Sequence, residues 1–223
     1  MKLLLTSAGI SNPGIHDALV DLLGKPVSES KALFIPTAIY AIPGSAEIVN
    51  KVIRGSLGDP FCDLNWKSLG ILELTTLSSI KPELWIPELQ EADALLVGGG
   101  DCQFLTYWMQ QSGLAALLPS LEIVYVGLSA GSMIMTSYGT TYGHHTLPPS
   151  VPKCLGLLDI AIHPHLDHEW FPDNSLSNIE KLAATISFPS YAIDDQTAIK
   201  VNGDSFEVVS AGHWKLLSHE IKS

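Results

Sequence analysis

Basic side chains are scarce in this sequence, and arginine is almost absent. The 223 residues include 12 Lys and Arg against 23 Asp and Glu, so the formal net charge is −11, and Arg54 is the single arginine. Nucleic-acid binding depends on clustered Lys and Arg that contact phosphates. The composition therefore argues against a nucleic-acid partner.

Long apolar runs and a disulfide framework are also missing. The N-terminal apolar run, residues 3–5, is too short for a signal peptide, and no later run is long enough to cross a membrane. The three cysteines, Cys62, Cys102 and Cys154, are widely spaced and odd in number, which favours a reducing compartment. We therefore expect a cytoplasmic protein without a membrane partner.

Apolar strand patterns alternate with amphipathic helix patterns along most of the chain. A 46% hydrophobic fraction with 16% charged residues is typical of a compact globular protein. The alternation predicts an α/β fold in three layers, with a mostly parallel sheet and helices on both faces. Asn202 and Gly203 predict a C-terminal β-hairpin. No linker or composition break appears, so residues 1–223 are expected to form a single domain.

The individual elements follow from hydrophobic periodicity and turn residues. Strands are expected at residues 3–7, 31–36, 71–74, 94–97, 122–126, 159–163 and 191–193. Helices are expected at residues 15–23, 45–53, 87–91, 103–111, 114–118 and 129–135. Ser177 and Glu180 have the spacing of a capping box that opens a further helix. Residues 139–152 are expected to form a loop.

The stretch from Tyr125 to Ser132 places a serine between two glycines. Ser129 follows the expected strand and begins the expected helix, so it falls in a strand-to-helix turn. Gly127 and Gly131 flank it without side chains, as such a turn requires. The pattern predicts a nucleophile, and the alternative is a glycine-bracketed turn with an incidental serine.

A glycine run, Gly98 to Asp101, follows the expected strand 94–97. Such a run lets a backbone N–H point outward, as an oxyanion hole requires, and the N–H of Ala130 would be the second donor. A phosphate-binding P-loop is excluded because the Gly-Lys-Ser/Thr sequence is missing.

Residues 163–168 read His-Pro-His-Leu-Asp-His and form the densest group of titratable side chains. A histidine in this loop can act as general base for a serine, with an acid two residues later to orient it. The same pattern is the zinc-ligand pattern of metal-dependent hydrolases, which would use His163, His165, Asp167 and His168. That alternative gives no role to the glycine run or the serine turn.

An α/β-hydrolase esterase is a second alternative, because its order is serine, acid and histidine. Ser129, Asp194 or Asp195, and His213 or His219 satisfy this order. The sequence has no His-Gly-Gly-Gly type loop after an early strand, and its C-terminal hairpin replaces the usual closing helix.

Taken in order, the motifs Gly-Gly-Gly-Asp (98–101), Gly-Leu-Ser-Ala-Gly (127–131) and Pro-His-Leu (164–166) resemble those of the peptidase E (α-aspartyl dipeptidase) family of serine peptidases, which is related to the cyanophycinases. The segment 192–199 also looks like theirs. The resemblance spans nearly the whole chain. It implies a class I glutamine amidotransferase-like (flavodoxin-like) fold and a serine-type peptidase that needs no cofactor and no metal.

Carried over by position, the resemblance implies Ser129 as nucleophile, His165 as general base, and Gly100 and Ala130 as oxyanion donors. In the dipeptidases an aspartate in the loop after the serine completes the triad, but no carboxylate lies between Ser129 and Asp159 here. We therefore expect Asp167 to orient His165, because it recreates the His-x-acid spacing of the class I amidotransferases. The fallbacks are Glu169 and Asp195.

The arginine with which the dipeptidases hold the substrate carboxylate has no counterpart around Asn174, so aspartyl specificity is not expected. The candidates to bind a different, even cationic, substrate are Gly99, Asp101, His144, His168, Asp173 and Asn174. We expect a small peptide or amide as the partner, and a homodimer is left open. A non-catalytic binding module on the same fold is the last alternative, since the usual triad aspartate is missing.

Overall fold

The computed structural model describes residues 1–58 and 60–217. Its strands are β1 (Lys2–Thr6), β2 (Lys31–Ile35), β3 (Ser68–Ile71), β4 (Ala94–Val97), β5 (Val124–Leu128), β6 (Ala161–His163), β7 (Ser190–Ile193), β8 (Thr197–Asn202), β9 (Ser205–Ser210) and β10 (Trp214–Leu217). Its helices are α1 (Pro13–Leu23), α2 (Ser45–Ile53), α3 (Leu74–Leu77), α4 (Ile86–Glu91), α5 (Cys102–Gln111), α6 (Leu114–Leu117), α7 (Ala130–Met133) and α8 (Leu176–Ala183).

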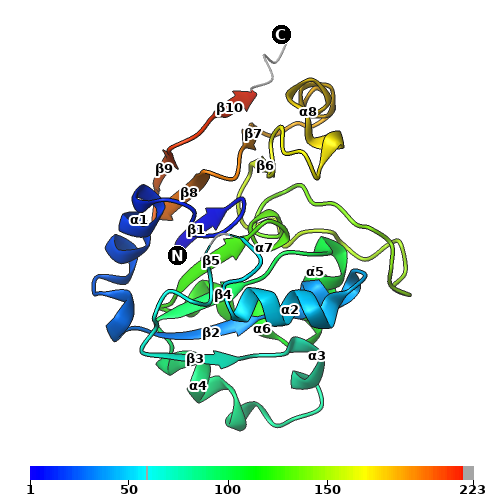
Figure 1. Ribbon diagram of the computed structural model, residues 1–223. Helices are drawn as coiled ribbons and strands as arrows, with labels where there is room; N and C mark the ends of the chain where they lie inside the picture. The colour runs from blue at the N-terminus through cyan, green and yellow to red at the C-terminus, as the bar shows by residue number, and fades with distance from the viewer. Residues whose placement is uncertain (59, 218–223) are drawn as a thin grey trace.

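A seven-stranded sheet with the order β3-β2-β4-β5-β1-β8-β9 forms the centre of the molecule (Figure 1). Strands β1 to β5 pair in parallel, and β8 and β9 add two antiparallel strands at one edge. The carboxyl ends of β4, β5 and β1 therefore lie side by side. This is the edge of an open α/β sheet where ligands usually bind.

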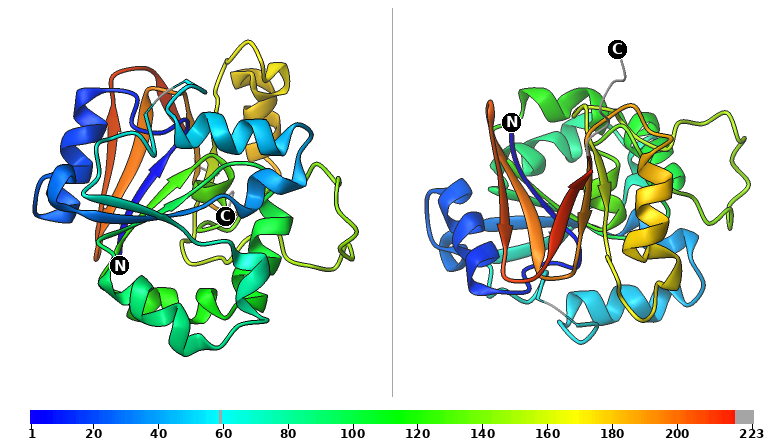
Figure 2. Two further views of the ribbon diagram at one scale, coloured as in Figure 1. Left: turned by 60° about the horizontal axis from the view of Figure 1, so that its bottom comes forward. Right: turned by 90° about the horizontal axis from the view of Figure 1, so that it is seen from above.

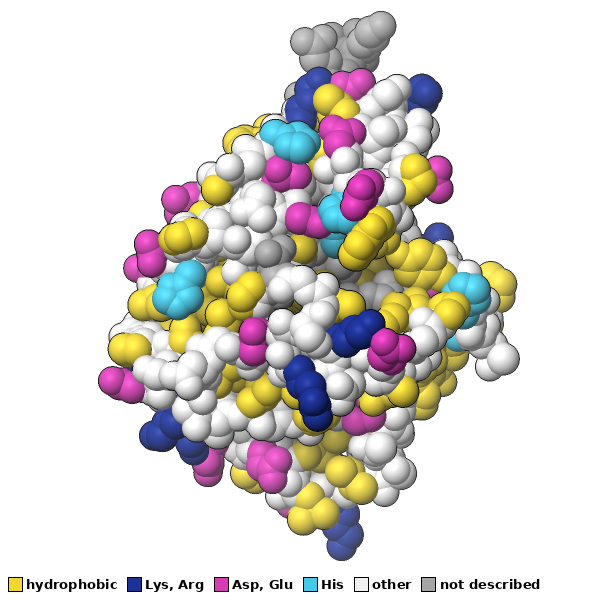
Figure 3. Space-filling view, viewed as in Figure 1, with side chains coloured by type: hydrophobic (Ala, Val, Ile, Leu, Met, Phe, Trp, Pro, Cys, Tyr) yellow, Lys and Arg dark blue, Asp and Glu magenta, His cyan; other side chains and the backbone are white. Residues whose placement is uncertain are grey.

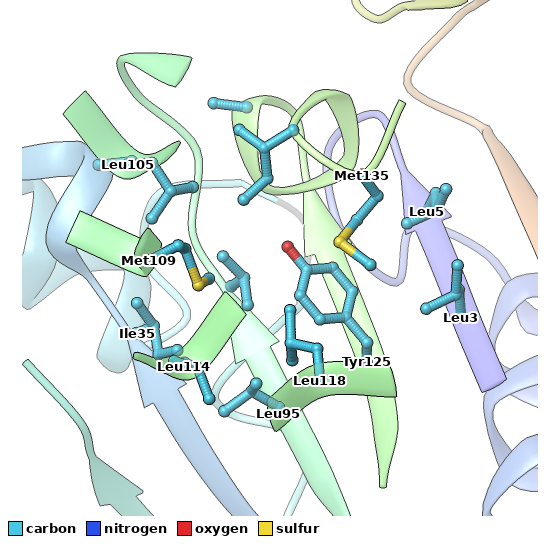
Figure 4. Close-up of a cluster of buried hydrophobic side chains, with 14 of the residues drawn as sticks. Leu3, Leu5, Ile35, Leu95, Leu105, Met109, Leu114, Leu118, Tyr125 and Met135 are labelled. Atoms are coloured by element: carbon cyan, nitrogen blue, oxygen red, sulfur yellow. The ribbon is translucent and has the colours of Figure 1, made fainter. Parts of the chain in front are cut away.

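Helices cover both faces of this sheet because successive strand residues point to opposite sides. Leu3 and Leu5 of β1 face one apolar cluster, which includes residues of α5, whereas Leu4 faces a second cluster that includes residues of α1. Figure 4 shows the first cluster, with Tyr125 lying among leucine and methionine side chains. The predicted three-layer α/β fold with a mostly parallel sheet is confirmed.

A second, three-stranded sheet with the order β10-β7-β6 lies beside the first (Figure 2). In it β6 and β7 are parallel, and β10 is antiparallel to β7. Helix α8 packs next to this sheet through Ile179, which contacts Leu166 and Ala192 in a small apolar cluster. The small sheet thus carries the loop that follows β6.

Several predicted boundaries differ from the structure. The third strand is β3 at Ser68–Ile71 and not residues 71–74, because Leu74–Leu77 forms α3, which the Glu73 carboxylate caps by accepting from the Thr75 N–H. Helix α7 ends at Met133. Helix α8 begins after Ser175, so the Ser177 capping box is wrong.

The predicted hairpin is confirmed as β8 and β9, whereas β10 escaped prediction. No helix in the ranges 1–58 and 60–217 is both long and apolar enough to cross a membrane. On the face shown in Figure 3, Lys and Arg side chains are scattered among acidic ones and form no single patch.

Candidate active site

Ser129 lies in a tight turn between β5 and α7 with φ 50° and ψ −110°. Few L-residues adopt this region, and it persists only where the surrounding structure enforces it. A Cβ at Gly127 would lie 2.6 Å from the Ser132 nitrogen, and one at Gly131 would collide with the Val97 carbonyl. The turn therefore requires both glycines, as in the strand-to-helix elbows that expose nucleophilic serines.

Buried hydrogen bonds from neighbouring strands hold the turn in place. The Thr6 hydroxyl donates to the Gly127 carbonyl at 2.7 Å, and the Thr6 carbonyl accepts from the Ser129 N–H at 3.1 Å. The buried Tyr125 hydroxyl donates to the Gly131 carbonyl at 2.6 Å. Because these partners belong to β1 and β5, the central sheet itself fixes the orientation of Ser129.

His165, two residues after the end of β6, reaches across to this serine. Its Nε2 lies 3.0 Å from Ser129 Oγ, and its Nδ1 lies 2.7 Å from Asp195 Oδ1. The Phe171 ring stacks on the imidazole with centroids 4.4 Å apart and fixes its plane. Serine, histidine and aspartate thus form one hydrogen-bonded line, the arrangement that activates a serine nucleophile.

The acid in this line is Asp195, and the expectation for Asp167 is corrected. The Asp167 carboxylate accepts from the Leu176 N–H at 2.9 Å and lies 3.5 Å from His213 Nε2, with 45% of its side chain exposed. The backbone is left-handed at both His165 and Asp167, and the two side chains have different partners. Glu169, the other fallback, is exposed.

Asp195 is held by more than its bond to His165. The hydroxyl of Ser7, the residue after β1, donates a hydrogen bond to Asp195 Oδ1 at 2.7 Å. It accepts one from the backbone N–H of His165 at 2.8 Å. His168 Nε2 lies 3.5 Å from Asp195 Oδ2. Burial opposes ionisation of this carboxyl, but the bonds from His165 and Ser7, with the nearby His168, hold its pKa below its usual value. Asp195 is therefore an anionic partner for a histidine that receives a proton.

The glycine run lies beside the serine turn, where β4 ends. Gly100, with φ 123°, lines the same cavity as Ser129. The Ala130 N–H belongs to the first turn of α7, where N–H groups have no acceptor within the helix. Gly100 lines the cavity at Ser129, and Ala130 directly follows the serine, so their N–H groups are the candidates for an oxyanion hole.

A cavity of about 270 Å³ opens at Ser129 and is close to the lower end of pockets that bind small molecules. The residues that line it are Gly100, Ser129, Met133, Tyr138, Thr140, Tyr142, His163, Pro164, His165, Trp170, Phe171, Pro172, Asp173, Asn174, Asn178, Ile179 and Leu182. Of the expected substrate-binding residues, Asn174 and Asp173 lie here.

The other expected substrate-binding residues lie outside the cavity lining. Gly99 packs behind Ser129, His168 faces Asp195, and His144 is exposed on the loop after Gly143. The expectation for Asp101 is wrong, because its buried carboxylate is occupied within the protein.

Asp101 links the start of α5 to the loop that walls the cavity. It caps α5 by accepting the Phe104 N–H at 2.9 Å, and it accepts from the Thr141 hydroxyl at 2.9 Å and the Tyr142 N–H at 2.6 Å. His145 Nε2 lies 3.3 Å from the same carboxylate. A loop that looks irregular in sequence is thus tied to the helix beside the glycine run.

Among the described residues, the structure forms neither of the two alternative sites, the metal centre at residues 163–168 or the α/β-hydrolase triad with His213. Within residues 1–58 and 60–217, no three His, Cys, Asp or Glu side chains are arranged to hold a metal ion, and the 163–168 histidines face different partners. His213 pairs with Asp194 at 2.9 Å and is not the histidine at Ser129. His219 lies outside the described residues.

Sequence reasoning missed Ser7, although its place at the end of β1 is a signal of the same kind as the glycine run. It also missed Tyr125 as the donor that holds the turn and Phe171 as the ring against His165. The role of Ser7 depends on contacts between segments far apart in the chain. The roles of Tyr125 and Phe171 depend on side-chain geometry between residues six positions apart, which a motif does not reveal.

The chain matches a known protein family and is similar to solved structures. The family model of peptidase family S51 matches residues 3–209. Among solved structures, the chain is similar to a putative peptidase E protein from Listeria monocytogenes EGD-e, with a TM-score of 0.65, 20% identity, and coverage of 95% of this chain and 98% of that one.

It is also similar to a peptidase from an acI-B1 Actinobacterium, with a TM-score of 0.65, 18% identity, and coverage of 97% of this chain and 90% of that one. No curated protein matches the chain. The structural likeness shows a common fold, and the family model covers almost the whole sequence. The chain therefore belongs to peptidase family S51 and is a serine peptidase.

Proposed function

We propose that this peptidase cleaves small peptides or related amides through Ser129, His165 and Asp195, with an acyl-enzyme intermediate. The observation that carries the proposal is the continuous line from Ser129 Oγ to His165 Nε2, at 3.0 Å, and from His165 Nδ1 to Asp195, at 2.7 Å. The cavity at Ser129, at about 270 Å³, favours short substrates over an extended chain.

In the first step Ser129 Oγ attacks the scissile carbonyl carbon while His165 Nε2 takes the hydroxyl proton. The N–H groups of Gly100 and Ala130 stabilise the negative oxygen that forms. His165 then returns the proton to the leaving amine, and a water molecule hydrolyses the ester by the same route in reverse. Asp195 stays ionised throughout and stabilises the imidazolium.

The choice of substrate differs from that of an aspartyl peptidase. A carboxylate is held best by a bidentate arginine, and none of the residues that line the cavity is Lys or Arg. The one carboxylate in the lining, Asp173, would repel an anionic side chain. The proposed substrate is therefore not acidic at the residue next to the cleaved bond.

A fluorophosphonate probe tests the nucleophile. We expect labelling of the wild type at Ser129 and none in Ser129→Ala, and labelling at another residue would contradict the proposal.

A pair of matched variants tests the acid. Asp195→Asn keeps the size of the side chain but removes its charge, and we expect kcat to fall by about 10³- to 10⁴-fold, as for other Ser-His-Asp sites. Asp167→Asn, also in the loop region near His165 but bonded to Leu176 and His213, is the control and should stay within a few-fold of wild type. Equal losses in both variants would remove Asp195 from the mechanism.

A further inference from the structure

The two oxygens of the Asp195 carboxylate have different neighbours. Oδ1 forms hydrogen bonds with His165 Nδ1 and with the Ser7 hydroxyl, both at 2.7 Å. Oδ2 lies 3.5 Å from His168 Nε2. A carboxylate rotates broadly about its Cβ–Cγ bond, so bonds to one oxygen alone leave its plane loosely fixed. His168 is therefore placed where this carboxylate needs a second support.

The tautomer of the His168 ring follows from the bond at its other nitrogen. The backbone N–H of Trp170 donates a hydrogen bond to His168 Nδ1 at 3.1 Å, so Nδ1 is an acceptor and carries no proton in the neutral ring. The single N–H of the neutral imidazole is then at Nε2, the nitrogen that lies 3.5 Å from the anionic Oδ2. This distance is longer than that of a well-formed hydrogen bond, and the contact is an attraction between the N–H dipole and the carboxylate charge.

A tight turn and two aromatic rings hold the His168 ring in place. The His168 N–H donates to the His165 carbonyl at 3.2 Å, and the His168 carbonyl accepts from the Phe171 N–H at 2.9 Å. The imidazole packs against the rings of Trp170 and Phe171, with centroids 5.4 Å and 5.7 Å away. Phe171 also stacks on His165. One turn thus carries both the general base and the side chain that faces its acid partner.

We propose that His168 is a positioning residue for the reaction at Ser129, because its Nε2–H holds Asp195 Oδ2 and keeps Oδ1 aligned with His165 Nδ1. When His165 takes the proton of Ser129 Oγ, the carboxylate is already oriented to stabilise the imidazolium, so it does not have to reorient during the reaction. No proton passes to or from His168. His168 lies outside the cavity lining, so it acts through Asp195 and not on the substrate. This inference rests on the proposed function and adds a fourth side chain to its site.

Two variants at position 168 separate the N–H group from the ring. His168→Gln keeps a side-chain N–H donor and loses the ring, whereas His168→Phe keeps a ring beside Trp170 and Phe171 and loses both nitrogen atoms. The fluorophosphonate concentration is varied, which separates the maximal labelling rate at Ser129 from the concentration that gives half of this rate.

We expect His168→Phe to lower the maximal labelling rate about tenfold, the effect of one polar contact to a charged group. The half-maximal concentration should stay within about twofold of the wild-type value, because probe binding does not involve His168. His168→Gln should keep the maximal rate within about threefold of wild type.

His144→Phe, at an exposed histidine of the loop after Gly143, is the matched control and should label at the wild-type rate. The His168 side chain is 30% exposed, so urea unfolding should show that both variants at this position remain folded. A larger loss in His168→Gln than in His168→Phe would assign His168 to ring packing and overturn the proposal. Equal losses in the two variants, or no loss in His168→Phe, would overturn it as well.

A double-mutant cycle tests whether His168 acts through Asp195. In Asp195→Asn the carboxylate charge is absent, so adding His168→Phe should lower the maximal labelling rate by less than about twofold, against about tenfold in the wild-type background. Losses that multiply independently would overturn the positioning role. The single variants separate this inference from the proposed function. A loss in Asp195→Asn without one in His168→Phe removes His168 alone, whereas wild-type labelling of Asp195→Asn removes the proposed triad and the role of His168 with it.

Discussion

Replacing His163 by phenylalanine should change how the stability of the protein depends on pH. The folded protein keeps this imidazole neutral down to about pH 4, because burial lowers its pKa to about 4, whereas in the unfolded chain it binds a proton below its ordinary pKa of 6.5. Between these values the unfolded state binds more protons than the folded state. The free energy of unfolding therefore decreases as the pH falls from 6.5 to 4.

The size of this effect follows from the same two values. The gap between 6.5 and about 4, at about 1.36 kcal/mol for each pH unit, corresponds to about 3 kcal/mol. Because His163 is 5% exposed, solvent screening reduces this figure little. The contribution is fully present above pH 6.5 and is lost near pH 4.

The assay is urea unfolding from pH 8 to about pH 4 for three proteins: the wild type, His163→Phe, and His16→Phe, which makes the same change at a histidine on the surface of α1. Carboxylates titrate in all three, so their effect cancels when the curves are compared. We expect the wild type and His16→Phe to lose about 3 kcal/mol more than His163→Phe over this range. Parallel curves for all three proteins would refute a buried neutral imidazole at position 163.

Three further changes test the supports of the site. Tyr125→Phe leaves the buried Gly131 carbonyl without its donor, so urea titration should show a loss of about 1–3 kcal/mol, and an unchanged midpoint would contradict this. Gly131→Ala pushes a methyl group into the Val97 carbonyl; we expect a similar or larger loss and slower fluorophosphonate labelling, and labelling at the wild-type rate would argue against a sterically fixed turn. Ser7→Ala removes the hydroxyl between His165 and Asp195, so steady-state kinetics should show kcat about tenfold lower with KM little changed, whereas a change in KM alone would assign Ser7 to substrate binding.

Local sequence patterns were sufficient to predict the elements for which hydrophobic periodicity and turn residues indicate the same boundaries. The short apolar run of β2 was sufficient to predict this strand. Helix α2 begins after Gly44, and its predicted bounds agree with the structure. The boundary between β3 and α3 could not be predicted in this way, because the apolar residues Ile71, Leu72 and Leu74 continue from the strand into a helix that Glu73 caps. Strand β10 needs β7 as its partner, so periodicity alone did not reveal it.

Within the active site, too, residues in local motifs could be predicted, whereas a residue that depends on a distant contact could not. Ser129 and the glycine run belong to short motifs at strand ends, and the topology brings those ends together. The acid partner depends on a contact between residues 30 positions apart, which exists because β6 and β7 are neighbours in the small sheet. Sequence spacing favoured Asp167, but the Asp167 carboxylate bonds to the Leu176 N–H and lies near His213, whereas His165 bonds to Asp195.

The division of the site between two sheets has a consequence for engineering. The nucleophile follows a strand of the large sheet, whereas His165 and Asp195 follow β6 and β7 of the small sheet. The Ser7 hydroxyl, which follows β1 of the large sheet, forms hydrogen bonds with Asp195 and with the backbone N–H of His165, and so links the two parts of the site. A substitution that shifts the small sheet would therefore change the distance between His165 and Ser129 without touching the serine, and it would move the cavity wall formed by the loop after β6 and by α8 at the same time.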